Sequence, residues 1–207
     1  MIKYKIFNLL EMFETNTYLV WDDDSKEAIL IDPASPNNDL KNEIVQMNLK
    51  LIYIVNTHGH GDHIGGNDYF HKEFNCPIGI HEFDAGMLVS SALNLSDMMF
   101  ASFVSPAPTL IINDNHKVTL GKFSIEIFHT PGHTKGGIVL YAKPYLFSGD
   151  TIFYLSVGRT DLPGGNTNQL LESIRKKILC LPDETIILPG HGPASTVGRE
   201  KADNPYV

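Results

Sequence analysis

Short apolar runs separated by polar turns fill the first quarter of the chain. The hydrophobic, β-branched and aromatic residues are concentrated at 4–9, 17–21, 28–31 and 51–55. Runs of this kind are typical of strands buried in a sheet. The polar run at 22–26 marks a turn between the second and the third strand. Asn37 or Asn38 can cap a helix that we expect to end near Met47.

A helix between two strands is predicted next. After the strand at 51–55 and a polar loop, residues 67–74 have helical spacing, and the apolar run 77–81 again indicates a strand. Strand, helix and strand in succession form a βαβ unit, so we expect a sheet covered by helices. Further strands are predicted at 117–120, 123–128, 137–141, 145–147 and, as the final strand, 185–188, with another helix at 168–179.

The stretch from about 82 to 108 has a different composition. It contains Met87, Met98 and Met99, three of the six methionines, and it ends in Pro106-Ala107-Pro108. Flexible thioether side chains are common at adaptable binding surfaces. The pattern is compatible with a helical lid over an active site or with an ordinary helical pair packed on the core.

The composition is that of an ordinary globular protein rather than a disordered one. At 207 residues, with 43% hydrophobic and 19% charged residues, it fits one domain covering 1–207. The net charge of −8 disfavours nucleic acid as a partner and a nuclease function. The chain shows neither a signal peptide nor an apolar window of membrane-spanning length, so we expect a cytoplasmic protein without a membrane partner. Cys76 and Cys180 are expected to be small core residues.

The most informative stretch follows the predicted strand at 51–55. It reads Thr57-His58-Gly59-His60-Gly61-Asp62-His63 and offers three imidazoles and one carboxylate within seven residues. Imidazole nitrogen and carboxylate oxygen together suit zinc, iron, manganese or nickel. Four potential ligands on a loop that leaves a strand end predict a metal site.

Three further residues occur in matching positions. His133, Asp150 and His191 each lie a few residues beyond a predicted strand end and beside a glycine. Loops at one edge of a sheet converge, so positions far apart in the sequence can share one cavity. The repeated pattern predicts that these three side chains complete a site for two metals.

The combined pattern resembles a known family. His58-x-His60-x-Asp62-His63, with His133, Asp150 and His191, is similar to the motif set of the metallo-β-lactamase superfamily. The stretch from Gly149-Asp150-Thr151 through 158–165, with Asn204-Pro205-Tyr206, resembles its compact glyoxalase II-like (hydroxyacylglutathione hydrolase-like) branch. The resemblance implies an α+β fold, a four-layer αββα sandwich with the metals at one edge of the two sheets.

The resemblance also implies roles for the ligands. One metal would be held by His58, His60 and His133, the second by Asp62, His63 and His191, with Asp150 bridging both. The metals would be two divalent ions, zinc in the first place, with iron or manganese as alternatives. A metal-bridging hydroxide would attack a small-molecule thioester of the S-lactoylglutathione type or a related ester. Asp62, which would also orient the hydroxide, and Asp150 are therefore the predicted catalytic residues.

Two residues of the loop after Asp150 are candidate substrate contacts. In glyoxalase II the position of Arg159 carries a basic residue that contacts glutathione, and a guanidinium suits a carboxylate. A local ion pair between Arg159 and Asp161 is the competing interpretation. Tyr154 on the same loop is a weaker candidate for the pocket wall.

Other functions remain open at this point. Persulfide dioxygenases share the fold, a similar ligand set and a related Gly-Arg-Thr-Asp stretch, but use a single iron; here 162–165 favours the hydrolase branch. About sixteen residues follow His191, which implies the form without the C-terminal glutathione-binding domain of glyoxalase II. The specific thioester is thus undetermined, and a lactone is possible. A non-enzymatic fold member is disfavoured because every ligand is retained. The sequence leaves the oligomeric state undetermined.

Overall fold

Two six-stranded sheets form the centre of the computed structural model, which describes residues 2–10, 13–98 and 101–207. The first sheet contains, in spatial order, β1 (Ile2–Leu9), β2 (Thr15–Asp22), β3 (Glu27–Ile31), β4 (Lys50–Val55), β5 (Ile78–His81) and β6 (Leu110–Ile112). The second contains β14 (Ser195–Thr196), β13 (Ile186–Pro189), β10 (Tyr145–Gly149), β9 (Ile138–Ala142), β8 (Phe123–His129) and β7 (Lys117–Leu120). A short hairpin of β11 (Ile152–Phe153) and β12 (Ser156–Val157) follows β10.

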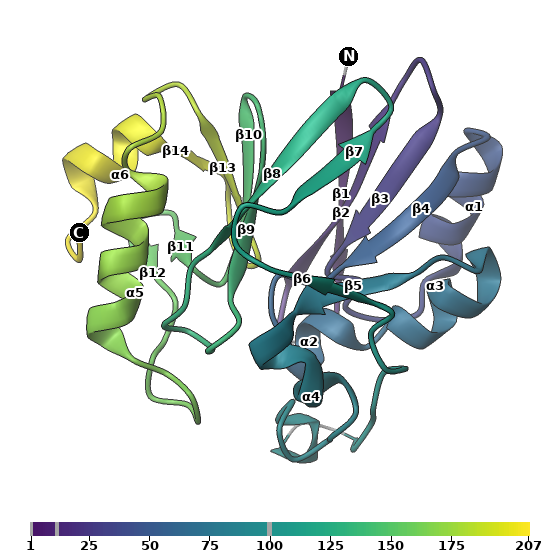
Figure 1. Cartoon of the computed structure of the whole chain (residues 1–207), viewed down its shortest axis with the longest axis horizontal. Helices are drawn as coiled ribbons and strands as arrows, with labels where there is room; N and C mark the ends of the chain where they lie inside the picture. The colour runs from purple at the N-terminus through teal and green to yellow at the C-terminus, as the bar shows by residue number, and fades with distance from the viewer. Residues whose placement is uncertain (1, 11–12, 99–100) are drawn as a thin grey trace.

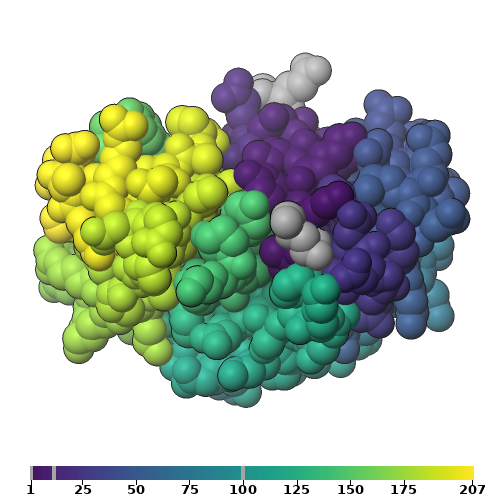
Figure 2. Space-filling model, turned by 90° about the horizontal axis from the view of Figure 1, so that it is seen from above, coloured from purple at the N-terminus to yellow at the C-terminus, as the bar shows by residue number. Residues whose placement is uncertain are grey.

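Helices cover the outer faces of both sheets (Figure 1). The first sheet is covered by α1 (Asn38–Gln46) and α3 (Asn67–Phe74), and the second by α5 (Thr167–Ser173), its π-helical continuation Ile174–Ile178, and α6 (Val197–Asp203). Seen from above, the purple N-terminal strands lie between the yellow C-terminal segment and the blue segment that follows them (Figure 2). The predicted α+β, αββα sandwich is therefore confirmed.

Alternation of side chains along the strands produces three apolar layers. In β3, Leu30 packs toward the helices with Leu40, whereas Ile29 points between the sheets with Ile127. A third cluster, including Leu170, fills the space between the second sheet and α5. Because strand side chains alternate faces, a fully apolar strand such as β3 must be buried on both sides.

Most predicted elements are present with small changes at their ends. The predicted βαβ unit is confirmed, since β4 and β5 pair in parallel with α3 between them. The Asn37 side chain accepts a hydrogen bond from the Leu40 amide at 2.7 Å and so caps α1. The predicted helix at 168–179 is observed as α5 followed by its π-helical turn.

The prediction missed the short strands β6, β11, β12 and β14. The strand at 185–188 is not the final one, because β14 and α6 follow it. The strand β6 was not expected at all. Strands of two or three residues, such as β14 and β6, are too short to show a hydrophobic period, so only pairing with a neighbour defines them.

Residues 82–108 contain only short helical segments in the part that the structure describes. These are two 3₁₀ turns, Glu82–Asp84 and Ser96–Met98, and α4 (Ala85–Leu88). A regular helical pair is therefore not seen there, and Met99 lies outside the described residues. Phe83 and Leu93 on this segment are more than half exposed. A lid over the active site stays a prediction. No helix in the described part of the chain has the length and apolar character that crossing a bilayer requires.

The two cysteines differ in their environment. Cys76 is buried, as expected, but Cys180 is exposed because it follows the last turn of the helical segment on the solvent side. Burial raises the pKa of the Cys76 thiol to about 11, since a buried thiolate lacks hydration.

We expect an aromatic disulfide reagent to label Cys180 rapidly in the folded protein and Cys76 only after unfolding. The reason is that the thiolate is the reactive form and Cys76 is both inaccessible and protonated. Mass spectrometry of time points, with Cys180→Ser as the control that removes the fast phase, measures this. Equal labelling rates for both thiols would contradict the burial of Cys76.

Candidate metal centre

Loops from both sheets carry the predicted ligands to one edge of the sandwich. His58 and His60 lie between β4 and α2 (Gly61–Ile64), and Asp62 and His63 lie on α2 itself. The other three follow strands of the second sheet: His133 follows β8, Asp150 follows β10 and His191 follows β13. The seven residues thus meet because the two sheets pack face to face.

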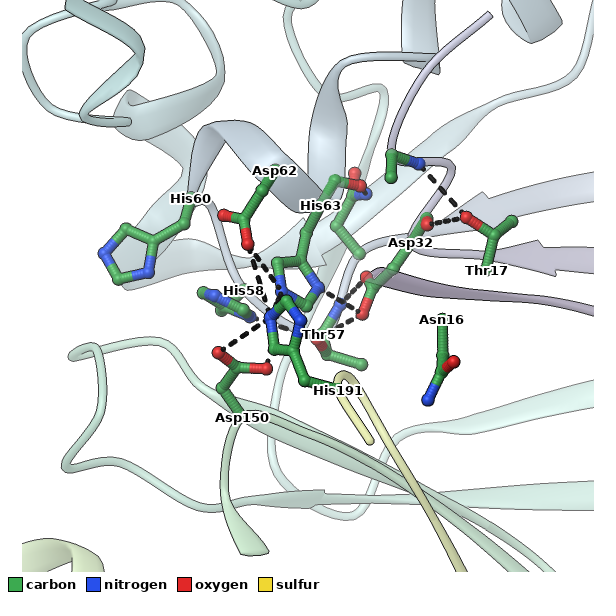
Figure 3. Close-up of polar contacts among 12 residues, drawn as sticks. Asn16, Thr17, Asp32, Thr57, His58, His60, Asp62, His63, Asp150 and His191 are labelled. Carbon is green, nitrogen blue, oxygen red and sulfur yellow. Dashed lines mark hydrogen bonds and ion pairs between the residues drawn. The ribbon is translucent and has the colours of Figure 1, made fainter. Parts of the chain in front are cut away.

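The side chains form three overlapping groups. Within each group the ligand-type atoms lie within 4.8 Å of one another. The groups are His58 with His60 and His133; His58 with His63 and Asp150; and Asp62 with His63 and His191. Figure 3 shows the Asp62, His63, Asp150 and His191 side chains pointing toward one another.

Asp150 lies between the first group and the third. Its Oδ2 is 3.6 Å from His133 Nε2 and 3.5 Å from His191 Nε2, and its Oδ1 is 3.4 Å from His63 Nε2. Imidazoles also face each other directly, with 3.0 Å between His60 Nδ1 and His133 Nε2. One carboxylate with a contact to each group has the placement of a bridging ligand.

Buried atoms without partners test whether this donor set fits metal ions. His58 Nε2, His60 Nε2 and Asp150 Oδ1 are buried and have no hydrogen-bond partner among the residues that the structure describes. Leaving such atoms unpaired in a native protein is costly. Coordination to a cation would satisfy His58 Nε2 and Asp150 Oδ1, so the residues present fit divalent metals.

In His63, His133 and His191, the ring nitrogen that points away from the site, Nδ1, is hydrogen-bonded by the protein. The Nδ1–H group of His63 donates to Asp32 at 3.0 Å, that of His133 to the Arg159 carbonyl at 2.7 Å, and that of His191 to the Phe13 carbonyl at 2.8 Å. Such bonds fix the tautomer and leave Nε2 free to face the centre, as in established metal sites.

Burial and charge give the histidines different protonation. Burial, reinforced by nearby imidazoles, holds the pKa of His58 well below its usual range and lowers that of His60 to about 3. Burial also opposes protonation of His191, but hydrogen bonds to Asp150 and Asp62 outweigh it and raise its pKa to about 10. Since neutral imidazole is the form that coordinates metal, ions binding beside Asp62 must displace protons.

Two glycines permit the close approach of the ligand loops. A Cβ at Gly190 would lie 2.3 Å from Asp150 Oδ1 and 2.8 Å from the His63 ring. Gly149 has φ of +48°, and a Cβ there would lie 2.3 Å from Thr57 Oγ1. The glycines noted beside the ligands in the sequence therefore serve to bring backbone against the site.

A cavity of about 500 Å³ opens above the ligands. Its base is formed by His60, Asp62, His133, Asp150 and His191, and its remaining walls by Phe13, Leu95, Phe153, Ser156, Val157, Arg159 and Leu162. This volume is within the range of small-molecule sites. The mostly apolar walls would exclude water from the polar base.

The candidate substrate contacts are placed differently from each other. Arg159 lines the cavity, and its guanidinium makes two 2.8 Å bonds to the Asp161 carboxylate, so the competing ion pair is present. Tyr154 is not among the lining residues; its ring lies 5.2 Å from the Arg199 guanidinium, and its neighbour Phe153 faces the cavity instead. Phe153 ends β11, whereas Tyr154 lies in the turn that leads to β12, so strand alternation does not place its side chain.

Two buried acids that support the site were not singled out from the sequence. The Asp32 carboxylate accepts from the Thr57 amide at 2.7 Å and from its hydroxyl at 2.6 Å, besides His63. Asp84 accepts hydrogen bonds from the loop that carries His58 and His60 and from the loop that carries His133. Asp32 follows the end of β3 just as the candidate ligands follow the ends of their strands. The pattern that identified the ligands could therefore also have identified Asp32. Asp84 lies in a turn without any such pattern.

Comparison with known proteins agrees with this geometry. The profile of the Metallo-beta-lactamase superfamily matches residues 11–191. The hydroxyacylglutathione hydrolase GloC of Haemophilus influenzae is 36% identical over 199 residues, covering 94% of this chain and 93% of that protein. The crystal structure of the BLEG-1 B3 metallo-β-lactamase has a TM-score of 0.93 at 36% identity, over 99% of both chains. The crystal structure of TTHA1623 in a di-iron-bound form has a TM-score of 0.85 at 30% identity, over 98% of this chain and 100% of that one.

The fold and the histidine-rich site define a class, that of metal-dependent hydrolases built on an αββα sandwich. Within this class, the chain belongs to the metallo-β-lactamase superfamily. Its resemblance to the glyoxalase II-like branch is supported by the relative GloC. Members of the superfamily bind divalent metals, and the site described above is where this chain offers the ligands.

We expect Asp150→Ala to lower both metal content and turnover, because it removes the only carboxylate that contacts both ligand groups among the described residues. The loss of activity should exceed about a hundredfold, since even partners that only orient ligands are worth ten- to a hundredfold. Elemental analysis and steady-state kinetics measure the two effects. Asp183→Ala, which changes an exposed acid, is the matched control; two metals and full activity in Asp150→Ala would refute the bridging role.

Proposed function

We propose that this protein is a dinuclear metal-dependent hydrolase that cleaves a thioester of the hydroxyacylglutathione type or a related small ester. The observation that carries the proposal is the position of Asp150 between two groups of ligand-type atoms at the base of a small cavity. One ion would be held by His58, His60 and His133, the other by Asp62, His63 and His191, and Asp150 would contact both. Zinc is the expected metal, and iron and manganese suit the same donors.

The metals and the protein would share the work of hydrolysis. When bound, two divalent ions would lower the pKa of a water molecule at the site and polarise the substrate carbonyl. Asp62, whose carboxylate is buried and lies 3.3 Å from His191 Nε2, would accept a hydrogen bond from that water and orient it. A thiolate is a weak base, so its departure requires no strong acid from the protein.

The cavity walls would select the substrate. Leu95, Phe153 and Leu162 offer apolar contact to an acyl or thiol group, and Arg159 supplies a cation at the same cavity. The ion pair of Arg159 with Asp161 is exposed, with 61% and 68% of the two side chains accessible, and pairs of this kind are weak in water. A substrate carboxylate could therefore take the place of Asp161 at the guanidinium.

The names of the similar proteins support hydrolysis and differ in substrate. GloC is a hydroxyacylglutathione hydrolase, whereas BLEG-1 is a B3 metallo-β-lactamase. The di-iron form of TTHA1623 supports the presence of two ions in this branch of the fold. The substrates to test therefore include a thioester, as for GloC, and a β-lactam, as for BLEG-1.

We expect the purified protein to contain two divalent ions per chain and to hydrolyse S-lactoylglutathione or another thioester faster than a lactone or a β-lactam. Elemental analysis combined with this panel measures both properties. A single iron per chain with oxygen uptake on glutathione persulfide would replace the hydrolase assignment with that of a persulfide dioxygenase. Preferential cleavage of a β-lactam would retain the hydrolase and reject the thioester.

We expect Arg159→Ala to raise KM for an anionic thioester about tenfold or more, with little effect on a small neutral ester. Loss of uniform substrate binding raises KM without changing kcat. Asp161→Asn is the matched variant, because it frees the guanidinium and should lower KM for the same anionic substrate. Equal effects of Arg159→Ala on both substrates would exclude a carboxylate anchor.

A further inference from the structure

A buried acid outside the ligand set joins the two loops that carry one ligand group. Asp84 ends the 3₁₀ turn that follows β5, and only 1% of its surface is exposed. Its Oδ2 accepts a hydrogen bond from the Gly59 amide at 3.2 Å and from the Thr134 hydroxyl at 2.7 Å. Its Oδ1 accepts one from the Gly136 amide at 2.7 Å.

The positions of these three donors relate Asp84 to one group of ligands. Gly59 lies between His58 and His60, while Thr134 and Gly136 follow His133. The three histidines are the ones whose nitrogens lie within 4.8 Å of one another in the first ligand group. In the described part of the chain, the three donors to Asp84 lie beside His58, His60 and His133, and none of them is next to Asp62, His63 or His191 in sequence.

The two loops belong to different sheets. The loop with Gly59 leaves β4 of the first sheet, and the loop with Thr134 and Gly136 connects β8 to β9 of the second. Sheet packing alone positions such loops through apolar contacts, which are not directional. Three hydrogen bonds to one carboxylate add direction, and they fix the separation of the two loops at the site.

The surroundings of Asp84 indicate that its carboxylate is built into this junction. Among the described residues, no basic side chain forms an ion pair with it, so the three donors alone compensate its burial. A Cβ at Gly136 would lie 2.7 Å from the Asp84 carboxyl, which shows how closely the backbone approaches. A neutral side chain of the same size could not accept from both amides and the hydroxyl.

We propose that Asp84 is a positioning residue that holds His58, His60 and His133 at the spacing needed to bind one of the two metal ions. The proposal rests on the proposed function for the identity of the ligands. Its competing interpretation is that Asp84 is a buried acid that stabilises the fold without any specific effect on the site.

Glu200 provides a matched control for that interpretation. It is also fully buried and accepts three hydrogen bonds, from the Leu155 amide at 3.0 Å, from Asn204 Nδ2 at 2.7 Å and from the Ser195 hydroxyl. None of these donors is adjacent in sequence to a proposed ligand. Glu200→Gln therefore perturbs a buried acid of the same kind away from the ligand loops.

The experiment compares the wild type with Asp84→Asn, Thr134→Val and Glu200→Gln. Asp84→Asn keeps the side-chain size but removes one acceptor that faces an N–H group. Zinc affinity is measured by competition with a chelator, and imidazole ¹⁵N shifts report which histidines are bound. In the metal-free proteins, hydrogen exchange of the Gly59 and Gly136 amides reports whether the loops are held. Denaturant unfolding measures stability separately.

We expect Asp84→Asn to weaken zinc binding by the group of His58, His60 and His133 about tenfold or more. Zinc affinity of the group of Asp62, His63 and His191 should stay within about twofold of wild type. Thr134→Val should act in the same direction with a smaller effect, which keeps the test valid if Asp84→Asn folds poorly. Exchange at Gly59 and Gly136 should accelerate in Asp84→Asn. Glu200→Gln should lower the stability of the fold. It should leave the zinc affinity and the hydrogen-exchange rates of the Gly59 and Gly136 amides unchanged.

Two results would overturn the inference. One is an Asp84→Asn protein that binds both zinc ions with wild-type affinity or keeps wild-type exchange at the two amides. The other is an Asp84→Asn protein that loses affinity for both zinc ions equally, while Glu200→Gln loses the same affinity when its stability is reduced by the same amount. A wild-type protein that binds none of zinc, iron and manganese would instead reject the proposed function, and the exchange measurement would then decide the role of Asp84 alone.

Discussion

Seven imidazole and carboxylate side chains share one largely buried volume at the edge of two sheets, and the remaining structure keeps them there. Burying a carboxylate such as that of Asp62, or most of one such as that of Asp150, is costly unless opposite charge or hydrogen bonds compensate. The imidazoles of His63 and His191, whose Nε2 atoms lie 3.3 to 3.6 Å from oxygens of these carboxylates, supply part of that compensation within the chain. Divalent cations would supply it more completely, and they would also satisfy buried atoms such as His58 Nε2.

A set of polar contacts behind the ligands limits how far each can move. Asp32 holds His63 from the end of β3, and the Phe13 carbonyl holds His191. The end of β13 is itself fixed, because the Tyr18 hydroxyl and the Asn16 side-chain Nδ2 both donate to the Pro189 carbonyl. Each contact joins an element of the first sheet to a ligand or to a strand that carries one. The rigid scaffold thus determines the site geometry, as second-layer contacts do in metal sites generally.

The fold alone does not determine the substrate. This chain is similar both to GloC, a hydroxyacylglutathione hydrolase, and to BLEG-1, a B3 metallo-β-lactamase. Leu95, Phe153 and Arg159 line the cavity around the candidate ligands, where a substrate would meet them. A fold supports many reactions because the loops around one site can change while the core is retained.

The sequence by itself indicated the main strands and helices and the candidate ligands, because apolar runs such as that of β3 and the repeated ligand-after-strand pattern are local signals. The αββα class followed from the family resemblance that the ligand pattern carries. Tertiary structure alone decided the orientation of Tyr154 and the existence of strands as short as β14. It also decided that Asp84 contacts both ligand loops. Those features depend on contacts between segments far apart in the chain, and no local pattern of residues encodes which distant backbone amide a carboxylate will meet.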